Sequence, residues 1–125
     1  MAKVNVMEIK WLPEVEDHDY PAAESYLSLL FSLDRVAPMV AKLRSTGIVQ
    51  CKAKDLFRAS QLSLLGVSNL HVQKDTKKIE KGIALSPLLL VRDEQHGKLV
   101  IADGYHRLCA IYGFNEDALV HCKII

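Results

Sequence analysis

The chain has 125 residues, of which 50% are hydrophobic and 25% are charged, and its formal net charge at pH 7 is +1. This size and composition predict one globular domain over residues 1–125, which can bury a core without disulfides or a structural metal. The nearly neutral charge argues against a protein that coats nucleic acid by electrostatic attraction alone.

The sequence also bears on the cellular compartment. Charged residues interrupt the N-terminal segment, and no stretch approaches the ~18 apolar residues of a membrane span. Cys51, Cys109 and Cys122 are widely spaced and form no Cys-x-x-Cys pair. We therefore expect a cytoplasmic protein with reduced thiols and no membrane association.

The first third of the chain predicts a strand followed by helix. Residues 4–11 are rich in apolar and β-branched residues and predict a strand buried on both faces and ended by Pro13. A helix is expected from Tyr20-Pro21. Pro38 should interrupt the helical pattern, which resumes as far as Gly47, giving two helices or one kinked helix. The apolar face expected for the first helix consists of Ala23, Tyr26, Leu27, Leu30, Phe31 and Leu33.

The remainder predicts helices, a hairpin and a last strand. Residues 53–60 indicate a short helix, 61–69 a loop with buried leucines, and 72–81 a basic helix ended by Gly82. Two apolar runs, 83–91 and 98–102, are joined by a polar segment typical of a hairpin. Residues 105–112 indicate a helix capped by Gly113, and 119–125 a strand. The expected fold class is α+β, with a small mixed sheet and several helices.

The segment Asp103-Gly-Tyr-His-Arg107 carries the chemistry. It joins an expected strand to a helix start, where the first backbone N–H groups lack helical partners and attract anions. Gly104 allows close approach, Arg107 has the planar donors that grip phosphate, and His106 can donate a hydrogen bond or move a proton. Cations in a first helical turn are unfavourable unless an anion is bound, so this segment predicts a phosphate pocket.

Asp103 has three open interpretations. Its carboxylate can hold Mg²⁺ together with phosphates, accept a proton from an attacking hydroxyl, or simply cap the following helix. A purely structural alternative combines this cap with a salt bridge made by Arg107.

The stretch Gly104-Tyr105-His106-Arg107 resembles the ParB/sulfiredoxin superfamily (ParB-like nuclease domain), whose signature is a strand followed by Gly-x-[His or Arg]-Arg at a helix start. The resemblance extends from Leu85 to the strand around Val120. It implies a ParB/sulfiredoxin-like fold in which Gly104, Tyr105, His106 and Arg107 line the phosphates of ATP, ADP or CTP, bound with Mg²⁺.

Departures from the family narrow this expectation. Tyr105 stands where sulfiredoxins have a catalytic cysteine, and Cys109, one turn later, should face away from the pocket, so sulfiredoxin activity is not expected. No helix-turn-helix domain follows residue 125 here, so centromere binding by this chain alone is not expected either. The Asp-Gly-x-His-Arg form looks most like the branch that includes free serine kinases. That branch takes its base from an acidic residue in the N-terminal part, here Glu14, Glu16, Asp17 or Asp19.

Two functions remain open. The leading one is a nucleotide-binding phosphotransferase or nucleoside triphosphate hydrolase, with Asp103 and His106 as catalytic residues. The other is a non-catalytic regulatory module that binds nucleotide or nucleic acid together with a partner protein. Outside this segment, His18 and the basic helix are interpreted as solvated surface, although that helix can also approach phosphates. His71 is explained by capping through Asn69, and no metal site is assigned from protein ligands alone.

Overall fold

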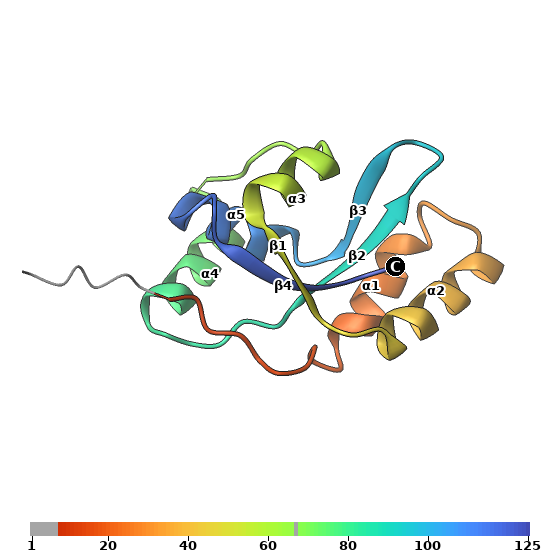
Figure 1. Ribbon diagram of the computed structural model, residues 1–125, viewed down its shortest axis with the longest axis horizontal. Coiled ribbons are helices and arrows are strands. Elements are labelled where there is room, and N and C mark those ends of the chain that lie inside the picture. The colour runs from red at the N-terminus through yellow and green to blue at the C-terminus, as the bar shows by residue number, and fades with distance from the viewer. Residues whose placement is uncertain (1–7, 67) are drawn as a thin grey trace, which may run out of the picture.

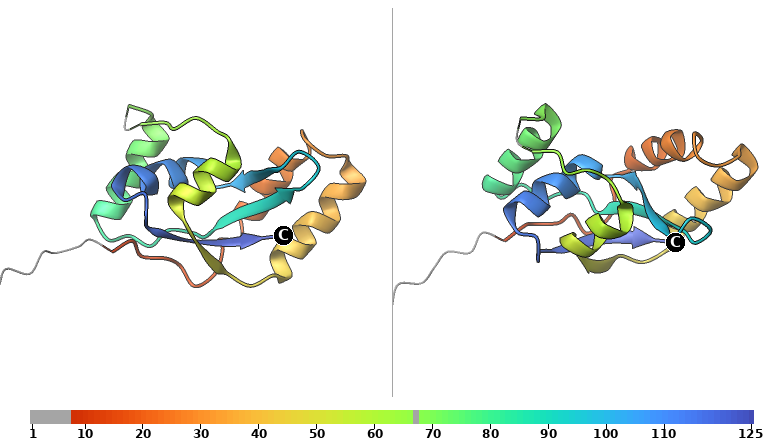
Figure 2. Two further views of the ribbon diagram at one scale, coloured as in Figure 1. Left: turned by 45° about the horizontal axis from the view of Figure 1, so that its top comes forward. Right: turned by 90° about the horizontal axis from the view of Figure 1, so that it is seen from above.

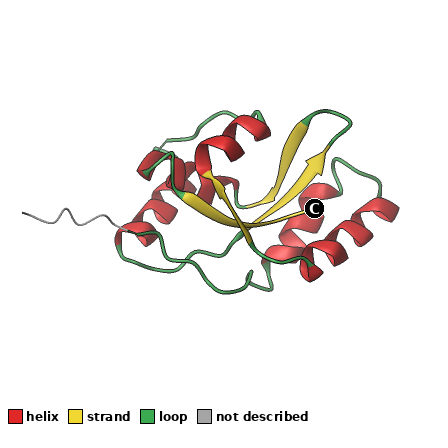
Figure 3. Cartoon of the chain, in the orientation of Figure 1, coloured by secondary structure: helices red, strands yellow, loops and turns green. Residues whose placement is uncertain are grey.

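The computed structural model describes residues 8–66 and 68–125. Within these residues it contains five helices and a four-stranded mixed sheet, so the predicted α+β class is confirmed (Figures 1 and 3). The elements in chain order are α1 Asp19–Leu27, α2 Leu33–Ser45, β1 Val49–Lys52, α3 Ala53–Ser60, α4 Leu70–Glu80, β2 Leu88–Asp93, β3 Lys98–Asp103, α5 Tyr105–Phe114 and β4 Leu119–Ile124.

The sheet has the strand order β1-β4-β2-β3. β1 pairs with β4 and β2 with β3 in antiparallel fashion, whereas β2 and β4 are parallel. The hairpin expected from the two apolar runs is therefore present, and its second strand leads directly into α5. β3 lies at the edge of the sheet and ends at Asp103, so the predicted phosphate turn lies at a corner of the fold.

Helices cover both faces of the sheet. Leu88 and Leu90 of β2 belong to a core with α3, α4 and α5, while Leu89 and Val91 belong to a second core with α1 and α2. This alternation follows from the two-residue period of a strand and explains why β2 is apolar throughout. Figure 2 shows α1 and α2 on the side of the sheet away from α3.

The predicted first strand is wrong for the part that the structure describes. Its first residues, 4–7, lie outside the described residues, and only Trp11 bridges another segment, at Leu85. The amide of Leu12 donates to the carbonyl of Leu85, and the amide of Leu85 donates to that of Lys10, both at 2.8 Å. Because β2 begins only at Leu88, the segment around Trp11 lies beside Leu85 before that strand starts and does not extend the single bridge into a ladder. Trp11 stacks on His121 with ring centroids 4.9 Å apart and packs against the core, as expected.

The helical break also falls elsewhere than predicted. α1 ends at Leu27, and Pro38 lies inside α2. The Ser28 hydroxyl donates to the Glu24 carbonyl at 2.7 Å, a local bond that helps to close α1, whereas Pro38 removes a single N–H from α2. Of the expected apolar face only Ala23 and Leu27 are fully buried, and Tyr26, Leu30 and Leu33 are exposed.

Three smaller expectations are also corrected. β1 is too short to give a clear sequence pattern and was not predicted. Gly113 lies inside α5, which continues to Phe114. Of the loop leucines, Leu62 is 41% exposed and Leu64 51%, and only Leu65 packs against the core, where it is half-buried. Over the described residues, none of the helices is both long enough and apolar enough to cross a membrane.

Candidate functional site

The turn between β3 and α5 depends on Gly104. Its φ of 110° is a left-handed conformation that residues with a side chain rarely adopt. A Cβ atom added there would lie 2.5 Å from Cγ of Leu88 and 2.9 Å from Nη2 of Arg107. Glycine is therefore required both by the backbone angle and by the space, and α5 begins at the next residue as predicted.

The start of α5 presents free donor groups. Its first internal hydrogen bond runs from the Leu108 amide to the Gly104 carbonyl at 2.9 Å, so the amides of Tyr105, His106 and Arg107 precede the helical ladder. Among the described residues no side chain caps this end, so the interpretation of Asp103 as a helix cap is wrong. The turn keeps the donors that an anion would use.

Asp103 instead pairs with Arg107. Nη2 of Arg107 lies 2.9 Å from Oδ2 of Asp103 and 3.6 Å from Oδ2 of Asp19, so one nitrogen serves two carboxylates. The salt bridge expected under the structural alternative is thus present. Nε of Arg107 is buried and has no partner within the described part of the chain, so the donors of this guanidinium are only partly satisfied.

Of the four acidic residues considered as a base, the structure brings Asp19 to the turn. Asp19 is 3% exposed, at the first position of α1, and accepts a hydrogen bond of 2.6 Å from the Ser86 hydroxyl. His18 also lies 3.3 Å from its Oδ1. Glu14, Glu16 and Asp17 are exposed. Sequence alone could not choose among them, because the choice depends on where α1 begins relative to β3.

The carboxyl of Asp103 has a perturbed acidity. Burial raises the pKa of Asp103, the Arg107 guanidinium works in the opposite direction, and the nearby Asp19 carboxyl raises it further. A carboxylate whose charge is disfavoured by burial and by a second carboxylate is a stronger base than one in water. Asp103 and Asp19 thus form an acidic pair held around one guanidinium.

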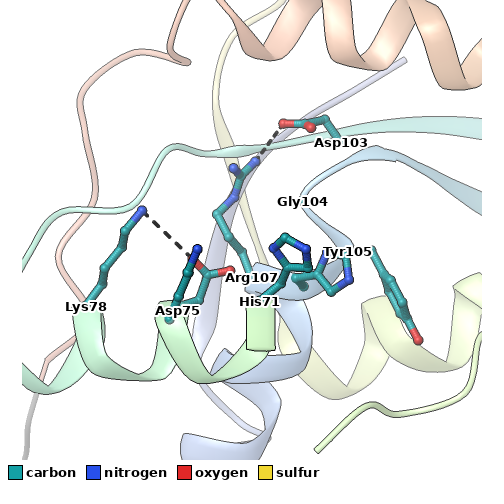
Figure 4. Close-up of a pocket in the computed structure, with 9 residues that line it drawn as sticks. His71, Asp75, Lys78, Asp103, Gly104, Tyr105 and Arg107 are labelled. Atoms are coloured by element: carbon teal, nitrogen blue, oxygen red, sulfur yellow. Dashed lines mark hydrogen bonds and ion pairs between the residues drawn. The ribbon is translucent and has the colours of Figure 1, made fainter. Parts of the chain in front are cut away.

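Helix α4 forms the opposite wall of a cavity of about 270 Å³. Its lining side chains, His71, Lys74, Asp75 and Lys78, recur at the spacing of one helical face, which turns toward Arg107 in Figure 4. From the turn, the cavity is lined by Asp103, Gly104, Tyr105, His106 and Arg107. The basic helix considered as solvated surface therefore directs one of its faces to the predicted phosphate turn. The signal that could have identified this face in the sequence is the helical spacing of its polar residues, His71, Lys74, Asp75 and Lys78.

Cations outnumber anions in this cavity. Lys74, Lys78 and Arg107 give three positive charges against two carboxylates, Asp75 and Asp103, when the histidines are neutral. Burial also raises the pKa of Asp75, against the opposing effect of Lys78, whose Nζ lies 4.0 Å away. The cavity is therefore suited to an anion, and two imidazoles add to its donors. The rings of His71 and His106 lie side by side with centroids 4.8 Å apart.

Several other expected residues make their main contacts outside this cavity, although Tyr105 also lines it. Tyr105 directs its hydroxyl to the Ser63 carbonyl, anchoring the loop before α4. Cys109 is buried and does not line the cavity, as expected. Asn69 caps α4 by accepting from the amides of His71 and Val72, as expected, although this does not prevent His71 from reaching the cavity.

No metal cluster is present in the described parts of the chain, where no three His, Cys, Asp or Glu side chains are arranged to hold an ion. Mg²⁺ commonly binds through one or two carboxylates together with substrate phosphates, and the carboxylates that line this cavity are those of Asp75 and Asp103.

Comparisons with known proteins add no relative. No family model, curated protein or solved structure matches this chain.

Proposed function

We propose that this chain binds a nucleotide through its phosphates in the cavity between α4 and the start of α5, and transfers a phosphoryl group. We further propose that it adopts the ParB/sulfiredoxin-like fold and is most similar to the branch with free serine kinases. The observation that carries the proposal is the cavity itself, where Lys74 and Lys78 of α4 face the free amides at the start of α5.

The binding chemistry follows from these donors. Phosphate oxygens would accept from the first amides of α5, with the helix dipole favouring their charge. Lys74 and Lys78 supply mobile charges, and His71 and His106 supply ring donors. Arg107 also lines the cavity, and its planar guanidinium has donors of the kind that bind phosphate oxygens.

The acidic pair supplies the proton chemistry. A hydroxyl that attacks a phosphate must lose its proton, and Asp103, with its raised pKa, is placed at the edge of the cavity to accept it. Asp19 accepts a hydrogen bond from Ser86 and lies 3.6 Å from Nη2 of Arg107, so it helps to hold the guanidinium beside Asp103. Mg²⁺ bound to the phosphates would neutralise part of their charge. The acceptor is a hydroxyl compound, or water in a hydrolase.

The test is the melting temperature with and without Mg²⁺ in the presence of ATP, ADP, CTP or GTP. A ligand at a hundredfold its Kd stabilises the folded state by ~2.7 kcal/mol. We expect a shift for one nucleotide that is lost in Lys78→Ala and kept in Lys77→Ala, because Lys77 is on the same helix but does not line the cavity. No shift with any nucleotide, or equal loss in both variants, would refute phosphate binding at this site.

Catalysis is tested separately from binding. Asp103→Asn should abolish nucleotide turnover while leaving measurable nucleotide affinity. A wild-type chain that binds nucleotide but shows no turnover with any hydroxyl compound or water would instead fit the regulatory module.

A further inference from the structure

A second cavity lies on the other side of the phosphate turn. It has a volume of about 460 Å³ and shares the residues Asp103, Gly104, Tyr105 and His106 with the charged cavity. Its remaining lining consists of Ala22, Tyr26, Leu62, Ile101 and Ala102. The two cavities therefore meet at the turn, and the side chains that line the second cavity outside the turn carry no charge.

Helix α1 connects this cavity to the acidic pair. Asp19, Ala22 and Tyr26 are spaced by three and four residues and therefore lie along one face of the helix. Ala22 and Tyr26 line the cavity, and Asp19 lies near Asp103 at the start of the same face. The cavity therefore has the Asp103 carboxylate and the His106 ring at the turn, and mainly apolar side chains elsewhere.

The geometry points to this cavity as the site of the phosphoryl acceptor, an alcohol with an uncharged aromatic or branched aliphatic body. This inference rests on the proposed function and names its second substrate by class. The hydroxyl lies against Asp103, and the apolar body lies along Ala22, Tyr26 and Leu62. Pockets of this size with an apolar lining and a few polar groups are typical of small-molecule sites.

Two other occupants fit the lining less well. A free amino acid such as serine carries an ammonium and a carboxylate besides its hydroxyl. When Asp103 receives the hydroxyl, the lining outside the turn offers neither an anion nor a cation to pair with these two groups. A nucleobase has several donors and acceptors on its edge, whereas the side chains outside the turn offer one hydroxyl, that of Tyr26. An alcohol needs a polar partner at one end only.

The transfer step balances without another reactant. The acceptor hydroxyl gives its proton to the Asp103 carboxylate, and its oxygen forms a bond to the terminal phosphorus of a nucleoside triphosphate. The bond between that phosphorus and the bridging oxygen breaks, and its electron pair leaves with the nucleoside diphosphate. No oxidation or reduction is involved.

The experiment is a titration followed by the methyl NMR signals of Leu62, Ile101 and Ala102, with benzyl alcohol as the probe and L-serine as its charged counterpart. Benzyl alcohol should shift these signals in the absence of nucleotide, and L-serine should not. Ala22→Phe, which fills the cavity from an exposed position, should weaken the alcohol at least tenfold. Ser25→Phe, which adds the same group to α1 outside the cavity, should leave its affinity unchanged.

Addition of saturating ATP with Mg²⁺ separates the two proposals. Retention of the alcohol alongside ATP supports an acceptor site, whereas displacement by ATP assigns the cavity to the nucleobase and overturns the inference. Binding of serine at these methyl groups, or no binding of benzyl alcohol, also overturns it. If ATP fails to bind and the alcohol binds, nucleotide binding is refuted while the preference of this cavity for an apolar alcohol is supported.

Discussion

At the scale of single residues, Gly104 is required both for the fold and for the geometry of the site. It is the residue that lets β3 turn into α5 with free amides at the turn, and it leaves no room for a Cβ atom beside Leu88. Gly104→Ala should lower the free energy of unfolding by about 1–3 kcal/mol, because it combines a strained φ with overpacking. Urea denaturation measures this loss. Gly47→Ala is the control, since its Cβ would meet open space and the change should stay within about 0.5 kcal/mol. Equal losses in both variants would contradict this account of the turn.

Asp75 gives a prediction about pH. Burial raises the pKa of the Asp75 carboxyl above its ordinary value, so the folded state holds this proton more tightly than the unfolded state does. Its contribution to stability is therefore full below the unfolded pKa and is lost as the pH rises through the folded value. Asp75→Asn should be more stable than wild type near neutral pH, and this gain should vanish in acid below the unfolded pKa. Urea unfolding across this pH range checks the sign, and a gain that persists unchanged in acid would show that titration is not its cause.

The residues of the site were predictable to different degrees. The turn from Asp103 to Arg107 is contiguous, so sequence alone indicates its geometry, and the structure places all five residues at one cavity. Asp19 and Asp75 come from distant segments, and their roles depend on packing that no local pattern encodes. Asp103 pairs with Arg107 and does not cap α5, and the sequence alone does not decide between these two roles of its carboxylate.

At the scale of elements, helix α4 supplies four of the nine residues that line the cavity, and Asn69 caps the start of this helix. The Asn69 side chain accepts from the amides of His71 and Val72 at 3.0 and 3.3 Å. Asn69→Ala should cost about 1 kcal/mol of unfolding free energy. It should also weaken nucleotide binding, because the first turn of α4 carries His71. Thermal melts with and without ATP measure both effects. Ser68→Ala is the neighbouring control, and a loss of the same size there would argue against capping.

The helices and strands predicted best are those that combine a strong local sequence pattern with a neighbouring element to pack on or pair with. The hairpin and α3 follow from strong local signals, and the packing around them confirms those signals. The segment before Pro13 has strand-like residues but finds only one bridge, at Leu85, whereas β1 has a weak pattern and gains a full partner in β4. Strand formation requires a partner, and the position of that partner is a property of the whole fold.

At the scale of the whole molecule, the site depends on α1 staying against the sheet, and a buried lysine helps to hold it there. Lys123 of β4 is 4% exposed, and its ammonium lies 3.1 Å from both the Tyr20 hydroxyl and the Arg44 carbonyl. This contact joins β4, α1 and α2 immediately beside Asp19. Because a buried charge needs its hydrogen-bond partners, the Tyr20 hydroxyl stabilises the docking of α1.

Tyr20→Phe removes that one oxygen and leaves the ring beneath Arg44 in place. It should cost about 1–3 kcal/mol of unfolding free energy, since the Lys123 ammonium keeps a single carbonyl partner among the contacts described. Relative to wild type, amide hydrogen exchange should also accelerate more in α1 than in α4, because α4 packs on α5 away from this contact. Tyr26→Phe, on the same helix but with an exposed ring, should change neither quantity. Uniform acceleration across the chain would mean that Tyr20 stabilises the fold as a whole and does not specifically hold α1, and Asp19 with it, against the sheet.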